Sequence, residues 1–316
     1  MAGGSQGLLT RAYYHLKPML PQKVRWALRR SRVPGILRRN ADTWPIDESA
    51  CGQPGDWQGW PDGKRFALVL THDVESAEGV GKTRNLAELE MTHGFRSSFN
   101  FIPEGSYETP EELREWLVEN GFEVGVHDLC HDGHLYESRA GFNQNARSIN
   151  RYLREWGAVG FRSGFMLRQL EWLHELDVLY DASTFDTDPF EPQPDGARTI
   201  FPFHVKPPAG VSRPGYVELP YTMPQDSTLF LLLREKTTDI WKRKLDWIAR
   251  HGGLALVNIH PDYVDFSGRH VDNTCYPSEL LADFMTHVRS EYQEAFWNPL
   301  ARELAAWHRD ACGAAS

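Results

Sequence analysis

Apolar and polar positions alternate regularly along the chain from residue 66 to residue 292. Short apolar runs, typical of strands buried on both faces, recur between longer segments in which apolar residues fall at helical spacing. The predicted strands are 66–70, 97–102, 122–126, 159–161, 178–180, 217–219 and 254–259. The predicted helices are 81–93, the segment between Thr109 and Gly121, the segment holding Phe142 to Trp156, 167–176, the segment holding Trp241 to Ile248, and 278–292. Repeated strand–helix units predict a parallel sheet, and about seven strands predict a closed or nearly closed barrel.

Two local features add detail to this pattern. Residues 109–112 read Thr-Pro-Glu-Glu, which predicts a helix start with Thr109 as the N-cap and Glu112 as the capping-box residue. The connection at 186–215 is rich in proline and too long for an ordinary loop, so we expect it to have a function.

Three segments follow from the composition: a basic arm over 1–40, a linker rich in Gly, Pro and Trp over 41–63, and the predicted barrel domain over 64–316. The linker tryptophans suggest that it is pinned to the domain. Together with 186–215, we expect the tryptophan loop at 44–60 to shape a substrate cleft.

The basic arm carries nine Lys or Arg residues and no acidic residue. Pro18, Pro21 and Pro34 should divide it into short helical pieces. Two interpretations stay open: the arm packs on the acidic body, or it makes a peripheral contact with an anionic membrane or a partner.

Charge and cysteine usage narrow the class of protein. The chain beyond the arm holds the other 25 basic residues and all 43 acidic ones, and such an acidic body makes nucleic acid an unfavourable partner. The four cysteines show no CxxC spacing, which excludes a small disulfide-stapled scaffold. The first residues lack the apolar run of a signal peptide, and no apolar run reaches the roughly 18 residues of a membrane span. We therefore expect a cytoplasmic protein. Eleven tryptophans favour a glycan substrate.

Polar residues suited to catalysis appear where the predicted strands end. The first strand runs into Asp73 and Glu75, the third into His127 and His131, and the fourth into Arg162; Asp181 follows the fifth strand and His260 the last. The carboxyl ends of the strands of a (β/α) barrel share one rim, where active sites lie. We therefore expect residues nearly 190 positions apart to meet in one cleft.

A metal site is predicted on that rim. His127 and His131 are four residues apart and can bind one metal ion, and a carboxylate from the first strand, Asp73 or Glu75, would complete three ligands. In extended backbone Asp73 and Glu75 point to the same side, so one acid could hold the metal while the other takes a proton from water.

Three further residues are candidates for catalytic roles. His260 could donate a proton to a leaving amine. Arg162 could steady the carboxylate that acts as base, and Asp181 could orient a catalytic group; both could equally belong to structural ion pairs or turns.

In order and spacing, these residues resemble the motifs of the polysaccharide deacetylase family, also called the NodB-homology or carbohydrate esterase 4-like family. The resemblance covers roughly 64–290 and rests on five stretches. These are Thr71-His72-Asp73-Val74-Glu75, His127 to His131, Arg162-Ser163-Gly164, Asp181, and Val257-Asn258-Ile259-His260. Val74 stands where the family has its second aspartate, Gly164 where it has proline, and Asp128 where it has serine or threonine. The chain looks most like a divergent cytoplasmic branch linked to surface-glycan synthesis.

The resemblance implies a distorted (β/α)7 barrel, a divalent cation with Zn²⁺ expected, and hydrolysis of an N-acetyl or N-formyl group on an amino sugar. It places Glu75, His127 and His131 on the metal, Asp73 as the base and His260 as the acid, with Arg162 and Asp181 setting their charges. Two alternatives stay open. One is a non-sugar or metal-independent amidase of the same fold, and the other is a glycan-binding protein that has lost catalysis.

Overall fold

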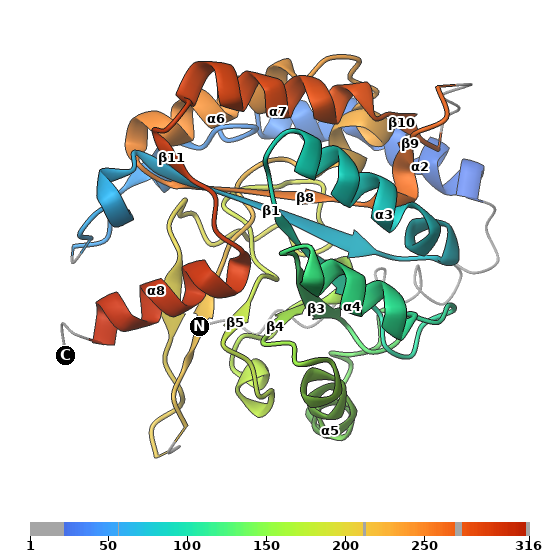
Figure 1. Ribbon diagram of the computed structural model, residues 1–316, viewed down its shortest axis with the longest axis vertical. Helices are drawn as coiled ribbons and strands as arrows, with labels where there is room; N and C mark the ends of the chain where they lie inside the picture. The colour runs from blue at the N-terminus through green and yellow to red at the C-terminus, as the bar shows by residue number, and fades with distance from the viewer. Residues whose placement is uncertain (1–21, 56, 211–212, 269–273, 314–316) are drawn as a thin grey trace.

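The computed structural model describes residues 22–55, 57–210, 213–268 and 274–313 (Figure 1). Seven parallel strands form a curled wall in the order β8-β1-β2-β3-β4-β5-β7. Their bounds are β1 (Phe66–Val74), β2 (Ser97–Phe101), β3 (Glu123–His127), β4 (Gly160–Arg162), β5 (Tyr180–Asp181), β7 (Tyr216–Glu218) and β8 (Leu254–Ile259). Each predicted strand is present, and the predicted distorted (β/α)7 barrel is confirmed.

The distortion lies between β7 and β8, where no strand ladder joins the two within the described ranges. Instead, in the chain after β7, the backbone N–H groups of Thr222 and Met223 both donate hydrogen bonds to the carbonyl oxygen of Leu256, each at 3.1 Å. The Thr222 hydroxyl also donates to the Leu254 carbonyl. The barrel is therefore closed at this seam by a few hydrogen bonds from a loop.

Five helices cover the outside of the wall (Figure 1). They are α3 (Ala77–Thr92), α4 (Glu111–Glu119), α5 (Arg139–Trp156), α6 (Asp239–His251) and α7 (Glu279–Tyr292). Helix α3 begins four residues before the predicted start, because the Ser76 side chain caps it. The predicted capping box is wrong: Pro110 is the N-cap of α4, and no side chain caps that helix. The helix predicted over 167–176 is only the 3₁₀ turn η5 (Trp172–Glu175).

Three pairings were not predicted. Within 186–215, β6 (Phe203–Val205) pairs antiparallel with β7. Strand β11 (Phe296–Trp297) lies beside β1, and β9 (Val264–Asp265) pairs with β10 (Tyr276–Pro277). These strands are as short as β4, β5 and β7, but they lie outside the repeated strand–helix units that the apolar pattern indicates.

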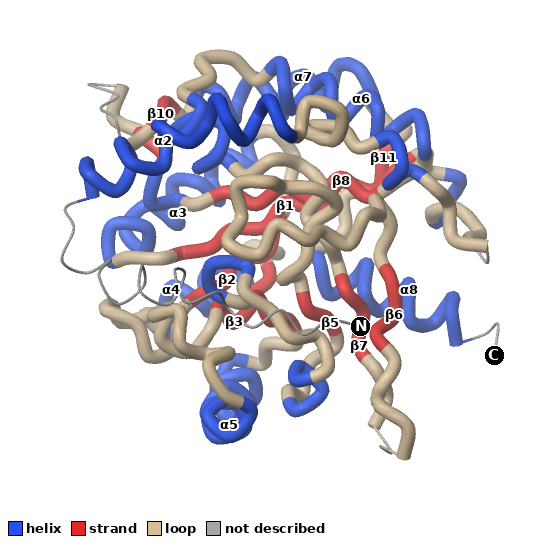
Figure 2. Tube along the Cα trace, turned by 180° about the vertical axis from the view of Figure 1, so that it is seen from behind, coloured by secondary structure: helices blue, strands red, loops and turns tan. Residues whose placement is uncertain are grey.

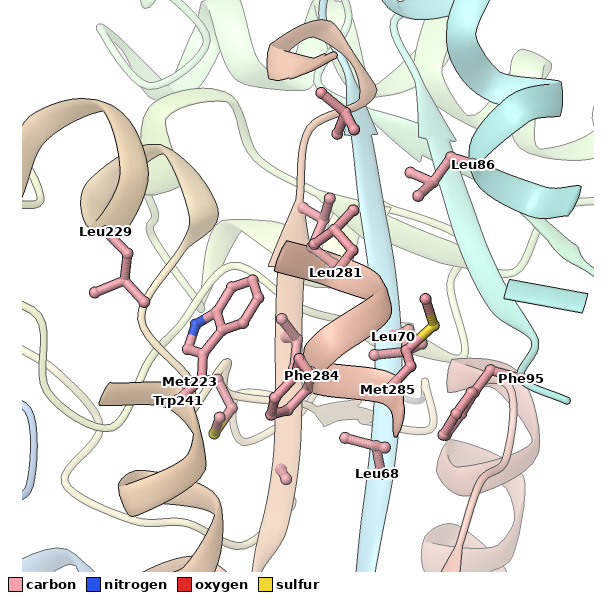
Figure 3. Close-up of a cluster of buried hydrophobic side chains, with 14 of the residues drawn as sticks. Leu68, Leu70, Leu86, Phe95, Met223, Leu229, Trp241, Leu281, Phe284 and Met285 are labelled. Atoms are coloured by element: carbon pink, nitrogen blue, oxygen red, sulfur yellow. The ribbon is translucent and has the colours of Figure 1, made fainter. Parts of the chain in front are cut away.

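Strand β1 shows why apolar runs in the sequence predicted the strands. Phe66, Leu68 and Leu70 face outward into the core under α3, α6 and α7, and Ala67 and Val69 face the barrel interior. Figure 3 shows Leu68 and Leu70 of this set packed with side chains from the covering helices. A strand buried on both faces needs apolar residues at every position.

Helix α8 (Ala301–Gly313) was not predicted, and it closes the amino end of the barrel together with Trp60. The Trp60 indole donates to the carbonyl oxygen of Gly252, just before β8. The Glu123 carboxyl group accepts the backbone N–H of Arg302 in the first turn of α8, while burial raises the pKa of Glu123. Trp57 and Trp60 lie at this end, so the expectation that they shape a cleft at the opposite rim is wrong.

The described part of the arm forms the helix α2 (Gln22–Arg39), with Pro34 inside it, so the predicted break at Pro34 is wrong (Figure 2). Pro34 is exposed, and the carbonyl that loses its helical donor there can be hydrated. Trp26 is buried, and the Arg30 guanidinium donates to the carbonyl of Leu231 at 2.8 Å. Packing on the body is therefore confirmed for this part, whereas membrane contact stays a prediction.

Pro18 and Pro21 lie outside the described residues. No helix in the described part of the chain combines the length and the apolar character that a membrane span requires.

Candidate active site

Polar side chains on the inner face of β1 lie at the carboxyl-end rim of the barrel. Side chains of a strand alternate between its faces, so Thr71, Asp73 and Glu75 continue the inward row begun by Ala67 and Val69. Asp73 is 2% exposed, whereas the Glu75 side chain, just past the strand, is 24% exposed. The deep acid and the shallow acid thus lie on one side of the chain.

Glu75, His127 and His131 form a cluster whose possible ligand atoms lie within 4.8 Å of one another. Oε1 of Glu75 is 3.1 Å from Nε2 of His131 and 3.9 Å from Nε2 of His127. Strand β3 ends at His127, and positive φ angles at Asp128 (58°) and His131 (54°) fold the turn so that both imidazoles face the same carboxylate. Asp73 is not part of this cluster.

The cluster has the properties of a metal site. The Nδ1 atom of His127 lies 3.1 Å from the carbonyl oxygen of Arg162, which fixes the tautomer that leaves Nε2 free to bind a metal. His131 packs against the ring of Phe165 at 4.2 Å. The Nε2 atoms of both histidines are buried and make no hydrogen bond of good geometry. Two imidazoles and one carboxylate are a ligand set that suits Zn²⁺ and related divalent cations.

Asp73 is held by three side chains. Its Oδ1 accepts from Asn100 at 3.0 Å and its Oδ2 from Asn258 at 2.8 Å, and Nη1 of Arg162 lies 3.6 Å from Oδ2. Burial would raise the pKa of Asp73, but the positive charges of Arg162, His127 and His260 outweigh it and lower the pKa to about 2. Each carboxylate oxygen keeps a lone pair for a water molecule.

His260 is paired with a carboxylate that the sequence did not reveal. Its Nδ1 lies 2.7 Å from Oδ1 of Asp226, and its backbone N–H donates to Oδ2 of the same residue. The Tyr276 hydroxyl also donates to Oδ2. Burial would lower the pKa of His260, but Asp226 outweighs it and raises the pKa to about 10. The free Nε2 is 4.0 Å from Oε1 of Glu75.

Arg162 and Asp181 are both fully buried. Arg162 donates to the Thr71 hydroxyl at 3.0 Å, and its Nη1 lies 3.6 Å from Oδ2 of Asp73, so its charge is next to that carboxylate. Asp181 instead accepts from the hydroxyl and N–H of Ser183, and it lies next to Glu218 in the β5–β7 register. Burial raises the pKa of Asp181. No described contact joins Asp181 to Asp73 or His260, and its catalytic role stays a prediction.

Asp262 fixes the backbone that carries Glu75. Its Oδ2 accepts the N–H of Glu75 at 3.0 Å, and its Oδ1 accepts the hydroxyl of Ser76. A Cβ on Gly79 would lie 2.4 Å from this carboxylate, so only glycine fits there. Lys82 adds a hydrogen bond to the carbonyl of Asp262. One short segment after β8 therefore carries His260 and also positions Glu75.

The residues that the sequence analysis missed differ in the signals they left. Asn100 and Asn258 interrupt apolar strands at inward positions, so alternation could have indicated them. Asp262 comes two residues after His260, so its closeness in sequence could have indicated it. Asp226 comes after β7 as the N-cap of the π-helix η6 (Ser227–Leu233), and nothing in the sequence links it to His260.

Comparisons with known proteins agree with this geometry at the level of fold. No protein-family model and no curated protein matches the sequence. A solved structure from Mycobacterium smegmatis, described as a candidate polysaccharide deacetylase, is 18% identical. The match covers 82% of this chain and 95% of that one, with a TM-score of 0.60. The chain therefore has the fold of polysaccharide deacetylases, the NodB-type barrel.

Two other matches have lower TM-scores. The peptidoglycan deacetylase PdaC from Bacillus subtilis is 10% identical, with 81% of this chain and 97% of that one covered and a TM-score of 0.47. BA3943 from Bacillus anthracis, described as a carbohydrate esterase 4 family pseudoenzyme, is 15% identical, with 78% and 66% covered and a TM-score of 0.45. At 18% identity the first match shows the fold alone, and the site must be judged from its own residues.

Proposed function

We propose that the protein is a metal-dependent amide hydrolase that removes an N-acetyl or N-formyl group from an amino sugar or a surface-polysaccharide precursor. The observation that carries the proposal is the partly buried Glu75–His127–His131 cluster, with a fixed carboxylate on one side and a charged histidine on the other. The fold shared with the deacetylase from Mycobacterium smegmatis supports the reaction class.

Glu75, His127 and His131 would hold a divalent cation, with Zn²⁺ expected. When bound, the ion would lower the pKa of a water ligand and polarise the acyl carbonyl oxygen. Asp73 is ionised at neutral pH because of Arg162, and its free lone pairs can take the proton of the attacking water.

His260 supplies the acid. The carboxylate of Asp226 holds Nδ1 of His260 and keeps the imidazole ring charged. Nε2 of His260 therefore carries a proton that faces the reaction centre. Donation of that proton to the amine nitrogen lets the carbon–nitrogen bond break. Base and acid therefore approach the substrate from β1 and from the end of β8.

Metal content and hydrolysis test the proposal together. The purified wild type should contain about one Zn²⁺-like ion per chain and release acetate or formate from N-acylated amino sugars. His127→Ala should lose both properties. His134→Ala is the matched control, since this histidine pairs with Glu137 outside the cluster, and it should change neither.

The other outcomes separate the alternatives. Hydrolysis that persists in metal-free wild type would replace the proposal with a metal-independent amidase. A bound ion with sugar binding but no turnover of any N-acylated sugar would replace it with a glycan-binding protein.

A further inference from the structure

We propose a second metal site for a borderline-soft divalent cation at Glu48, Cys51 and His251. The possible ligand atoms of these residues lie within 4.8 Å of one another. The site does not depend on the proposed hydrolase activity, because it shares no residue with the cluster at Glu75.

The local backbone brings the first two ligands together. Glu48 and Cys51 are the first and last residues of the 3₁₀ helix η2 (Glu48–Cys51). Side chains three residues apart eclipse one another in a 3₁₀ helix, so the carboxylate and the thiol project from the same face. The Asp47 side chain caps the turn by accepting the N–H of Ser49 at 2.9 Å, which fixes that face.

The third ligand comes from the end of α6. His251 is the last residue of that helix, where the unpaired carbonyl groups create partial negative charge that favours a cation. The Gln53 side chain donates to the carbonyl of His251 and joins the segment after η2 to the helix end. Two segments 200 positions apart in sequence thus meet at one point.

Trp247 contacts two of the three proposed ligands and fixes their positions. Its indole N–H donates to Oε2 of Glu48 at 2.9 Å, and its ring lies 5.4 Å from the ring of His251. Trp247 is 1% exposed and therefore rigidly held. A fixed group that hydrogen-bonds a ligand carboxylate is the usual support of a metal site.

The ligand chemistry defines the class of ion. A thiolate, a carboxylate and a neutral imidazole suit Zn²⁺ or Co²⁺ and do not suit Mg²⁺ or Ca²⁺, which prefer oxygen ligands. The thiol of Cys51 donates to the carbonyl of Glu48 at 3.1 Å. On binding, its proton passes to solvent and the sulfur electron pair forms the metal bond, so two anionic ligands balance the 2+ charge.

The position indicates a structural role. His251 and Gly252 lead into β8 at the amino end of the barrel, and Leu254 pairs with Ala67. Since β1 rises about 3.3 Å per residue, Ala67 at this end lies roughly 26 Å from Glu75 at the other. A bound ion would tie η2 to the start of β8 without touching the active site.

Cobalt titration of metal-free protein tests the site, because only a thiolate ligand gives an intense near-ultraviolet charge-transfer band with Co²⁺. The cluster at Glu75 contains no sulfur. In His127→Ala/His131→Ala protein, the band should saturate at about one Co²⁺ per chain, and Zn²⁺ should raise the Tm. Adding Cys51→Ser or His251→Ala should remove the band and the Tm shift.

Cys130→Ser is the control, because this exposed thiol is not in the cluster and its loss should leave the band unchanged. A band that survives Cys51→Ser, a band lost in Cys130→Ser, or no band at saturating Co²⁺ would each overturn the proposal. Loss of hydrolysis in the double variant bears only on the site at Glu75, so the two proposals fail separately.

Discussion

Gly164 is packed so tightly against the active site that replacing it with alanine should weaken metal binding. An added Cβ would lie 2.4 Å from Oδ2 of Asp128 and 2.8 Å from Cδ2 of His131. To reach even 3.0 Å, the carboxylate must move by at least 0.6 Å and the imidazole by 0.2 Å. The backbone N–H of Gly164 donates to that same carboxylate oxygen at 3.1 Å, so the movement also strains this bond.

The expected loss follows from these displacements. Disturbing the groups that orient metal ligands typically costs 10–100-fold in affinity, which is about 1.4–2.7 kcal/mol. Overpacking at a buried position should also lower the free energy of unfolding by about 1–3 kcal/mol. Because His131 shifts toward or away from Glu75 as a rigid ring, we expect weaker binding with the same stoichiometry.

Competition with a chromophoric chelator measures the affinity, and thermal unfolding of the metal-free protein measures the stability. Gly81→Ala is the matched control, because a Cβ there meets nothing within 4 Å and alanine favours the helix by about 1 kcal/mol. If Gly164→Ala binds the ion within twofold of wild type at unchanged Tm, the packing described around Asp128 and His131 is incorrect.

Three further predictions concern other parts of the site and core. His72→Phe should lower the free energy of unfolding by about 3 kcal/mol in urea, because it leaves a buried oxygen of Glu90 without its partner at 2.8 Å. The double variant His72→Phe/Glu90→Leu should recover most of this loss, and equal stability of the two variants would contradict the prediction. Asp262→Ala should weaken metal affinity at least about tenfold by releasing the Glu75 backbone, with partial rescue by Asp262→Asn, and unchanged affinity would exclude the positioning role. Burial and a neighbouring carboxylate raise the pKa of Glu191 to about 7 from an ordinary 4.5, so its stabilising contribution is complete below pH 4.5 and is lost as pH rises through 7. Glu191→Gln should therefore gain about 1–2 kcal/mol over wild type at pH 8 and nothing at pH 4, after allowance for partial exposure, and a pH-independent effect would refute the pKa shift.

The strands and the rim could be predicted because both depend on local composition. A strand buried on two faces must be apolar throughout, as β1 shows, and the chemistry begins where that run stops, at Thr71. The alternation of side chains along a strand also predicted that Asp73 and Glu75 point to the same side of the chain. Glu75 lies one residue beyond the strand, and its carboxylate belongs to the cluster with His127 and His131.

The remaining features depend on partners distant in sequence. The carboxylate of Asp226, at the start of the helix η6, reaches His260 across 34 positions, and no sequence pattern links the two residues. Helix α8 follows the last predicted helix, and its place is set by Glu123, 179 positions from Arg302. Pro34 was expected to end a helix because local propensity disfavours it, but packing of Trp26 and Arg30 on the body outweighs that preference.

The pairing of β1 with β8 has a consequence for how the protein acquires its chemistry during synthesis. Asn258 reaches Asp73 across 185 positions, and closing a loop of that length costs about 4–5 kcal/mol of chain entropy. A nascent chain that ends before β8 already contains Glu75, His127 and His131, yet it lacks Asn258, His260 and Asp262. In the proposed mechanism, the fragment therefore has the residues to capture a metal ion without the residues that direct the base and supply the acid. We therefore expect hydrolysis only after β8 has closed the barrel, because the proposed mechanism needs residues from both ends of the domain.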